Sequence, residues 1–558
     1  MRTEYQQLYL LHILNHILTS RSRIQRHNKQ IKQREEVEKA EEEEASKDSS
    51  QDKKNVKAED FGDFDENKLR DQGYTRPTVL VLLPTRGVCY RFVHALLKLV
   101  GDDHHTNTAS TGGGGGGKDY IERFESEYGV PPSTDENGEE NDSAAGGDAD
   151  DKERRRKAVL ERKGEAWLEL FGDDANQDDD FKMGIALTPK AVKKGKGNQE
   201  KESKVDNHQS NISVKLYSDF YKSDIIIASP LGLKILANPP DNDDEDGDDD
   251  LDGGGNDRMG DIDYLSSIEI CLVQNADVLM MQNWDHVNDV LEFLNQQPQK
   301  NNDTDFSRVR NYFLDGQAMH WRQLIISSNI IDPSIVSTFT RHAKSCSGRV
   351  KMRRRVASED ASISSVMLPL RHVFQRVTAS SLERQSDSRI AYFTKTILPQ
   401  ILRSKQTHTM IYIPSYFDFC SLRNIFLKRN LSFVSVTEYS RHTETSRGRA
   451  RFLQGRKPIM LYTGRCHFFH RHTMRGVKHL IFLGLPEHGE FYADQVSGMS
   501  SSTSANSEQF AGEEEATSTT SCLALFTKYD AHALERLVGT SNCQRMLRSD
   551  KSTFMFYS

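Results

Sequence analysis

One short stretch constrains the fold more than any other, because it joins an apolar run to a polar turn and a helix. Residues 268–273 are apolar apart from one glutamate, and residues 278–295 have the apolar spacing of a helix. Between them lie Gln274, Asn275, Ala276 and Asp277. Such a run is typical of a buried parallel strand, and α/β sheets bind their ligands at the carboxyl ends of these strands. The sequence therefore predicts an α/β fold with a site near residues 274–277.

The four residues of this turn lack the charges that phosphoryl transfer needs. A site that hydrolyses a nucleotide uses carboxylates to hold Mg²⁺ and to orient the attacking group. Gln274 and Asn275 carry neutral amides, which are weak ligands for Mg²⁺ and cannot act as a general base. Asp277 is the only carboxylate of the four. We therefore predict no catalytic residue, no metal and no cofactor at this position.

Strands and helices alternate on both sides of a basic stretch, which predicts two open parallel α/β domains. The first domain covers residues 74–345, the basic linker residues 346–365 and the second domain residues 366–558. An N-terminal helical segment, residues 1–45, and an acidic linker, residues 46–73, precede them. The helical segment has an apolar stripe and is expected to pack on the body of the protein or on a partner. The predicted strands are residues 78–83, 181–188, 223–228, 268–273, 321–329, 410–413, 433–436, 458–462, 479–483 and 522–526.

Polar insertions interrupt both domains and are too rich in small and charged residues to pack into a core. They lie near residues 101–119, 131–157, 190–211, 240–263 and 497–521, and we predict that they are disordered. Within the first of them, Gly112 to Lys118 fits the pattern G-x-x-x-x-G-K of a phosphate-binding loop. This run follows no predicted strand, and Asp119 stands where the pattern needs a hydroxyl for Mg²⁺. A flexible linker explains the run better.

Charge is distributed unevenly along the chain. Residues 366–558 hold 25 Lys and Arg against 15 Asp and Glu, a net of +10, whereas the whole chain has a net charge of −8. A basic domain is typical of proteins that bind nucleic acid, although an ordinary solvated surface explains this difference equally well. The seven cysteines form no CxxC pair, and the chain has neither a secretory signal nor an apolar run of the ~20 residues that span a membrane. We therefore expect an intracellular, soluble protein with no membrane partner.

The order of these elements resembles the two RecA-like lobes of DEAD-box RNA helicases. In that family the strand that here precedes Gln274 ends in Asp-Glu-Ala-Asp, and the second lobe supplies arginines to the nucleotide. Here the tetrad is altered, and the corresponding stretch of the second domain, residues 491–496, holds no arginine. The resemblance therefore implies a helicase-like protein that lacks ATPase and helicase activity. An ATP-dependent RNA helicase with divergent motifs is the alternative, and a scaffold that binds only proteins is a third possibility.

The same resemblance implies contacts with RNA at the ends of two other strands. Pro84-Thr85-Arg86 matches the RNA-facing Pro-Thr-Arg of the first lobe, and Ser229-Pro230 resembles its second RNA-facing turn. Turns of this kind present N–H groups and a hydroxyl to phosphate oxygens. Simple strand-ending turns are the alternative explanation for both.

In the second domain, a segment rich in histidine and arginine is the best candidate for contacts with phosphates. Its arginines are Arg465, Arg471 and Arg475, and their charge would make binding sensitive to salt. The segment also holds a cysteine and three histidines, but their spacing matches no common zinc site, so we predict no metal there. These residues are Cys466, His467, His470 and His472.

More closely, the chain resembles the digestive organ expansion factor family, a Utp-type component of the small-subunit processome, over residues 74–558 apart from the insertions. The motifs that carry the resemblance include Ser223 to Leu233, Asp315-Gly316-Gln317-Ala318, His467-Phe468-Phe469-His470-Arg471 and Leu534 to Thr540. The family implies a factor of the nucleus and nucleolus that is needed for processing of pre-rRNA toward 18S rRNA. Its implied partners are pre-rRNA, box C/D small nucleolar RNA and processome proteins. The long acidic tail of the family is reduced here to residues 41–66, so we expect a shortened form.

Overall fold

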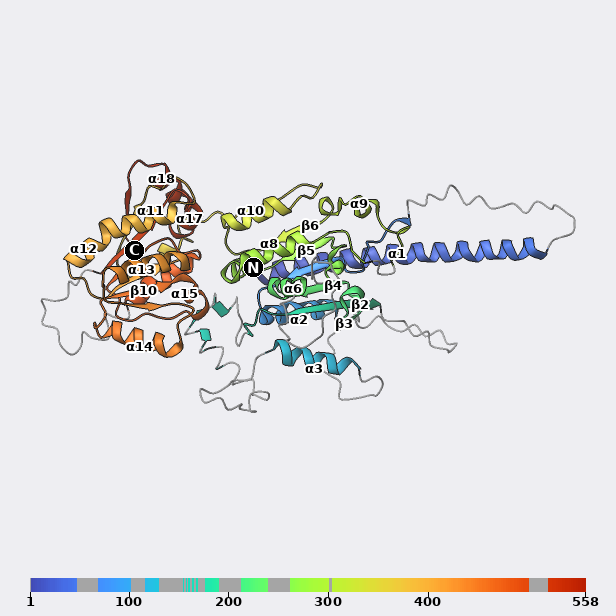
Figure 1. Cartoon of the computed structure of the whole chain (residues 1–558), viewed down its shortest axis with the longest axis horizontal. Coiled ribbons are helices and arrows are strands. Elements are labelled where there is room, and N and C mark those ends of the chain that lie inside the picture. Colours follow the sequence, from blue (N-terminus) through green and yellow to red (C-terminus); the bar gives the residue numbers. More distant parts are fainter. Residues whose placement is uncertain are drawn as a thin grey trace, which may run out of the picture. The chain divides into compact units, whose positions relative to one another are not determined.

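The chain folds into two compact units (Figure 1). A computed structural model describes residues 2–47, 69–101, 116–129, 176–189, 212–238, 261–300, 304–500 and 520–557, with isolated residues between 154 and 168. The first unit comprises residues 1–160, 164–329 and 333–350, and the second comprises residues 161–163, 330–332 and 351–558. Most of the stretches that we predicted to be disordered lie outside the described residues.

The first unit is built on a six-stranded sheet with the strand order β3-β2-β4-β1-β5-β6. The strands are β1 (Val79–Leu82), β2 (Lys182–Pro189), β3 (Ile212–Ser218), β4 (Ile225–Ala228), β5 (Ile270–Val273) and β6 (Gln323–Ile326). The central strands β4, β1 and β5 are parallel and buried along their whole length, because helices cover both faces of the sheet. Strand β2 runs antiparallel to β4 and β3, so one edge of the sheet departs from the predicted parallel arrangement.

Two apolar cores cover the two faces of this sheet. The helices are α2 (Arg86–Val100), α3 (Gly116–Tyr128), α6 (Pro230–Ala237), α7 (Ala276–Gln282), α8 (Trp284–Phe293), α9 (Asn311–Leu314) and α10 (Pro333–His342). The single helix predicted over residues 278–295 is wrong, because α7 and α8 are separated at Asn283. This residue has an extended backbone, and its side chain caps α8 by accepting a hydrogen bond from Asp285 N. The start of α3 is also helical where we predicted disorder.

Helix α1 (Arg2–Lys47) packs on the first unit, as one of the two alternatives predicted. Leu10, Ile13, Leu14 and Ile17 lie buried in the core that also contains α2 and α3. Polar contacts fix α1 across the amino ends of the parallel strands: His12 to Gln323 (2.7 Å), His16 to Glu269 (2.8 Å) and Arg21 to Asp224 (3.0 Å). Helix α1 therefore lies at the opposite edge of the sheet from Gln274. No helix among the described residues is both long and apolar enough to span a membrane.

The predicted linkers are partly folded. Asp71 is buried and pairs with Arg308 (2.7 Å) and His27 (2.7 Å), so the last residues of the predicted acidic linker belong to the first unit. Residues 46 and 47 of that linker end helix α1, and residues 48–68 lie outside the described residues. In the predicted basic linker, Val356 exchanges hydrogen bonds with Thr540, so residues from 351 onward pack on the second unit.

The second unit has a seven-stranded sheet in the order β13-β7-β12-β11-β8-β10-β9, and only the edge strand β13 is antiparallel to its neighbour. The strands are β7 (Arg371–Arg376), β8 (Thr409–Ile413), β9 (Phe433–Val436), β10 (Ile459–Thr463), β11 (His479–Phe482), β12 (Ser521–Phe526) and β13 (Thr553–Tyr557). The helices are α11 (Gln385–Tyr392), α12 (Leu398–Arg403), α13 (Tyr416–Lys428), α14 (His442–Leu453), α15 (Gly464–His470), α16 (Gly489–Ser500), α17 (Ala531–Val538) and α18 (Thr540–Arg548). Strands β7 and β13 and helix α18 were not predicted, and α16 extends into the predicted insertion at residues 497–521.

Candidate functional site

The altered tetrad forms the turn between β5 and α7 at the carboxyl edge of the first sheet. Gln274 N donates to Leu82 O (3.1 Å) and Ala276 N donates to Ser327 O (2.9 Å), which ties the turn to the two neighbouring strands. Asn275 has φ 55° and ψ 48°, a left-handed conformation that asparagine tolerates better than most residues. The turn is therefore fixed by backbone contacts that do not depend on a ligand.

The side chains of this turn do not fit Mg²⁺ and a nucleotide. Asp277 is 1% exposed, and its Oδ1 accepts a long hydrogen bond from Asn329 N (3.5 Å), so the only carboxylate joins β5 to the segment after β6. Gln274 Oε1 is buried and has no hydrogen-bond partner among the described residues. Neutral amides at these two positions supply no anionic oxygen for a hard cation. Across the described part of the chain, no group of three or more His, Cys, Asp or Glu side chains can hold a metal ion.

The predicted RNA-facing turn at Pro84-Thr85-Arg86 is the start of α2. Thr85 is 1% exposed, and its hydroxyl accepts a hydrogen bond from Val88 N (3.4 Å). Its carbonyl accepts a hydrogen bond from Cys89 N (3.0 Å). The hydroxyl that would face a phosphate therefore caps the helix instead.

A segment that the sequence analysis did not select covers this turn. We call residues 176–180, Asn-Gln-Asp-Asp-Asp, the acidic segment. Arg86 N donates to Asp178 O (2.9 Å) and Gly87 N donates to Asn176 O (2.9 Å). The Arg86 guanidinium lies 2.9 Å from the Asp178 carboxylate and donates to Asp180 O (2.8 Å). All four N–H groups of the first turn of α2, which could otherwise bind an anion, have partners within the chain.

The acidic segment continues along the second predicted turn, at Ser229-Pro230. Ser229 is 1% exposed and caps α6, because its hydroxyl accepts a hydrogen bond from Gly232 N (2.9 Å). Ser229 N donates to Phe181 O (3.0 Å). A Cβ atom at Gly232 would lie 2.6 Å from Phe181 O and 3.2 Å from Asp180 Oδ1. The backbone of residues 180–181 therefore packs closely against the start of α6. The acidic segment and Phe181, which follows it, thus cover the two turns. Burial and the charges of Asp178 and Asp180 raise the pKa of Asp179.

In the second unit, the three arginines predicted to contact phosphates differ in their exposure to solvent. Arg475 is exposed and Arg465 is half-buried, with its guanidinium 6.0 Å from the centre of the Phe469 ring. Arg471 is 7% exposed and pairs with the carboxylates of Asp494 and Glu490. The expectation that Arg471 faces phosphates is therefore not supported, since protein carboxylates already hold its charge.

The histidines of this segment do not converge on one point. His467 is buried and lies 3.4 Å from Asp494 Oδ2, with Gln495 Nε2 3.0 Å from its Nδ1. His470 and His472 stack on each other at 5.3 Å between ring centres. Burial acts to raise the pKa of Asp494, but the hydrogen bond with His467 and the charge of Arg471 outweigh it and lower the pKa.

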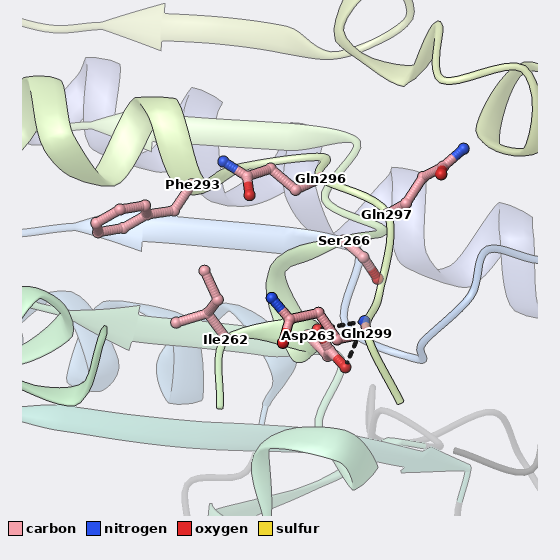
Figure 2. Close-up of a pocket in the computed structure, with 7 residues that line it drawn as sticks. All are labelled: Ile262, Asp263, Ser266, Phe293, Gln296, Gln297 and Gln299. Carbon is pink, nitrogen blue, oxygen red and sulfur yellow. Dashed lines mark hydrogen bonds between the residues drawn. The ribbon is translucent and has the colours of Figure 1, made fainter. Parts of the chain in front are cut away.

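A small hollow in the first unit does not coincide with any predicted site (Figure 2). Its volume is about 20 Å³, enough for about one water molecule. Asp263 lines it and accepts hydrogen bonds from Gln299 N (3.0 Å) and Lys300 N (2.8 Å). These residues precede β5 or follow α8, so the hollow lies away from the turn at Gln274, and its aspartate already holds a loop.

Two α/β units with mostly parallel sheets, and neutral amides where a nucleotide-hydrolysing site needs carboxylates, define an α/β protein whose turn after β5 lacks anionic ligands for a metal ion. A family model described as "UTP25, NTP hydrolase-like domain" matches residues 1–350, and one described as "Utp25, C-terminal domain" matches residues 362–556. The chain therefore belongs to the Utp25 family. The predicted Utp-type family is confirmed at this level, although the matches do not carry the name digestive organ expansion factor.

Several curated proteins are similar over nearly the whole chain. Protein NUCLEOLAR FACTOR 1 of Arabidopsis thaliana is 34% identical over 98% of this chain and 60% of its own length. The U3 small nucleolar RNA-associated protein 25 homolog of Homo sapiens is 32% identical over 99% of this chain and 59% of its own length. The U3 small nucleolar RNA-associated protein 25 of Schizosaccharomyces japonicus is 30% identical, with coverages of 99% and 68%. The chain thus spans about three-fifths of the length of the first of these relatives.

Solved structures similar to this chain include an RNA helicase and a protein bound to RNA. A hypothetical ATP-dependent RNA helicase from Sulfolobus tokodaii is 13% identical over 55% of this chain and 65% of its own, with a TM-score of 0.20. S. cerevisiae Dbp5, bound to RNA and ADP BeF3, is 10% identical over 87% of this chain and 80% of its own, with a TM-score of 0.23. The predicted fold class, two mostly parallel α/β sheets with an N-terminal helix, is confirmed.

Proposed function

We propose that this protein is a non-catalytic, helicase-like factor of ribosome biogenesis that binds RNA and ribonucleoprotein partners of the small-subunit processome. Support comes from the family and from the names of its relatives, which are called U3 small nucleolar RNA-associated proteins and a nucleolar factor. On this proposal the protein works in the nucleolus, contacts pre-rRNA and box C/D small nucleolar RNA, and is needed for processing toward 18S rRNA.

One observation carries the claim that the protein does not hydrolyse nucleotide. Gln274 and Asn275 stand at the end of β5 without charge, and the nearest carboxylate, Asp277, is buried against Asn329 N. Hydrolysis in this class of site depends on anionic ligands for Mg²⁺ and a residue that orients water. The chain offers neither at this turn, so we propose that it acts by binding.

The direct test measures ATP turnover of the purified chain with saturating single-stranded RNA. We expect no turnover that responds to RNA, and the same background rate in Gln274→Ala. Gln274→Ala is a suitable variant because its side chain is half-buried and its Oε1 makes no hydrogen bond among the described residues. RNA-stimulated turnover that disappears in Gln274→Ala would instead favour an ATP-dependent helicase with divergent motifs.

A second experiment tests the partners. Crosslinking of the protein to RNA in cells should yield reads in pre-rRNA and in U3 small nucleolar RNA. Depletion should lower 18S rRNA, and both the wild-type chain and Gln274→Ala should restore it. Crosslinks that are absent from these RNAs, with 18S rRNA unchanged on depletion, would favour a scaffold that binds only proteins elsewhere in the cell.

A further inference from the structure

Three neighbouring strands of the second sheet end side by side and deliver aromatic and basic side chains to one edge. In the strand order β8-β10-β9, the segment after β8 contains Phe417, the segment after β10 contains Arg465, and the segment after β9 contains Tyr439 and Arg441. The strands are parallel, so these segments all lie at the carboxyl edge. We call Phe417, Tyr439, Arg441 and Arg465 the stacking edge.

The aromatic rings of the stacking edge are unusually open. Phe417 is 83% exposed and Tyr439 is 66% exposed, whereas other rings of this unit, such as Phe426, are fully buried. Tyr439 is nonetheless held in place, because its ring packs edge-on against Tyr416 at 4.9 Å between centres. Tyr416 in turn lies 5.6 Å from the buried Phe419. A ring that is braced from below and open above is suited to stacking against a flat ligand.

The charges around these rings favour an anionic ligand. Arg441 is exposed and precedes α14, and Arg465 lies in the first turn of α15. The two carboxylates of the same segments are turned away from solvent. Glu438 accepts a hydrogen bond from the Thr463 hydroxyl (2.7 Å), and Asp418 accepts one from Ser386 and is 7% exposed. Glu444, on the first turn of α14, is the exposed carboxylate closest in sequence to Arg441.

We infer that the stacking edge binds single-stranded RNA, with bases stacked on Phe417 and Tyr439 and phosphates near Arg441 and Arg465. The inference rests on the proposed function for its choice of RNA as the partner. Open rings beside cations suit a chain of flat bases linked by phosphates, and sequence-tolerant binding of single strands uses this combination. A protein partner would be expected to need a broader apolar patch with well-packed anchors. In the first unit, by contrast, the acidic segment occupies the comparable turns.

The test uses the full chain and a fluorescein-labelled 15-nucleotide oligouridine, followed by fluorescence anisotropy at low salt. Phe417→Ala and Tyr439→Ala should each weaken binding by about fivefold or more. Replacing an aromatic ring on which one base stacks by alanine typically lowers the affinity by at least about this factor. Tyr557→Ala is the matched control, because Tyr557 is 75% exposed but lies on the edge strand β13. It should leave the affinity unchanged.

Further measurements separate stacking from charge and from the proposed function. Arg441→Gln should lower the slope of log affinity against log salt by about 0.7. A duplex of the same length should bind more weakly, because its bases are not free to stack. The double variant carries both Phe417→Ala and Tyr439→Ala. If it binds the oligonucleotide as well as the wild-type chain does, the inference about the stacking edge is wrong, although the proposal that the protein binds RNA is kept. If the wild-type chain binds no RNA, both fail. Loss of a protein partner in the double variant, with RNA affinity intact, would identify a protein-docking surface and also overturn the inference.

Discussion

The parallel strands of both units end in similar turns, but these turns are covered in the first unit and exposed in the second. In the first unit, Thr85 and Ser229 cap helices, and the acidic segment together with Phe181 covers the two turns. In the second unit, Phe417 and Tyr439 are exposed at the sheet edge whose segments also carry Arg441 and Arg465. A turn at the end of a strand therefore does not by itself mark a contact with RNA. What the rest of the chain packs against that turn decides whether a polyanion can reach it.

The first unit as described includes α1, which is held in place partly by Asp224. The substitution Asp224→Ala tests this anchoring, and we expect it to have the largest effect on stability of the variants proposed. Its buried carboxylate accepts hydrogen bonds from Arg21 (3.0 Å), Arg76 (2.9 Å) and Leu187 N (2.7 Å). Asp224→Ala leaves these donors without their acceptor. We expect the free energy of unfolding to fall by roughly 3–5 kcal/mol, measured by urea unfolding.

The matched control for Asp224 is Arg123→Ala, which removes an exposed pair with Glu127 (2.7 Å) on α3. That loss should be far smaller than the loss in Asp224→Ala, because an exposed pair within a helix contributes little to stability. Equal losses in the two variants would mean that Asp224 does not anchor α1, and the closed character of the first unit would then need another explanation.

The sequence predicted the centre of each sheet better than its edges. Strands such as β1 and β5 were predicted because both of their faces are buried and they read as unbroken apolar runs. Strands β3 and β7 were missed because they are partly exposed edge or near-edge strands that mix polar with apolar residues. The break between α7 and α8 depends on one capping side chain, that of Asn283, which an apolar pattern does not register.

The site was predictable in its chemistry but not in its accessibility. The amides at Gln274 and Asn275 are visible in the sequence, and their meaning follows from charge alone. Whether Thr85 caps a helix or faces a ligand is not visible, because the same residue types serve both purposes. The acidic segment lies about 90 residues after α2 begins, so its contacts with Arg86 and Gly87 arise from tertiary folding. The one local feature that could have pointed to these contacts is the run of three aspartates, residues 178–180, just before a predicted strand.

Arg471 and Arg475 sharpen the comparison within the second unit, because the same segment holds one internal and one external arginine. Arg471 is buried against Asp494 and lies 4.5 Å from the centre of the Phe491 ring. Arg471→Ala should lower the free energy of unfolding by about 1–3 kcal/mol, since it leaves the partly buried Asp494 carboxylate with only its long contact to His467. Arg475→Ala should leave stability unchanged and lower the salt dependence of RNA binding. A folded Arg471→Ala variant with lost RNA affinity would restore Arg471 as a contact residue.

Glu487 provides a smaller, pH-dependent test at the same edge of the second sheet. Burial and the charge of Asp332 raise the pKa of its carboxyl from 4.5 to about 7, against the opposing charge of Arg536. The folded state therefore binds more protons than the unfolded state between these values, and stability falls as pH rises through that window. Glu487→Gln should remove this fall and gain roughly 1–2 kcal/mol above pH 7 in urea unfolding. Glu490→Gln, at an exposed glutamate, should show no such gain.

Substitutions in the acidic segment test most directly whether its carboxylates keep RNA away from the first unit, and we expect their effect to be the smallest. Replacing Asp178, Asp179 and Asp180 by asparagine removes three negative charges and the ion pair with Arg86, but keeps the backbone acceptors for Arg86 N and Gly87 N. The edge of the first unit should then repel RNA less, and we expect oligouridine affinity at low salt to rise by roughly threefold to tenfold.

The control for this triple variant must match its change in net charge without touching the turns. Asparagine at Asp285, Asp305 and Asp315, which are exposed residues of the same unit, meets this condition. If both triple variants gain affinity equally, the effect is one of total charge. If neither gains, the carboxylates do not close this edge, and its backbone contacts alone do so. A gain confined to the acidic segment would mean that the first unit retains a surface for phosphates beneath its own carboxylates.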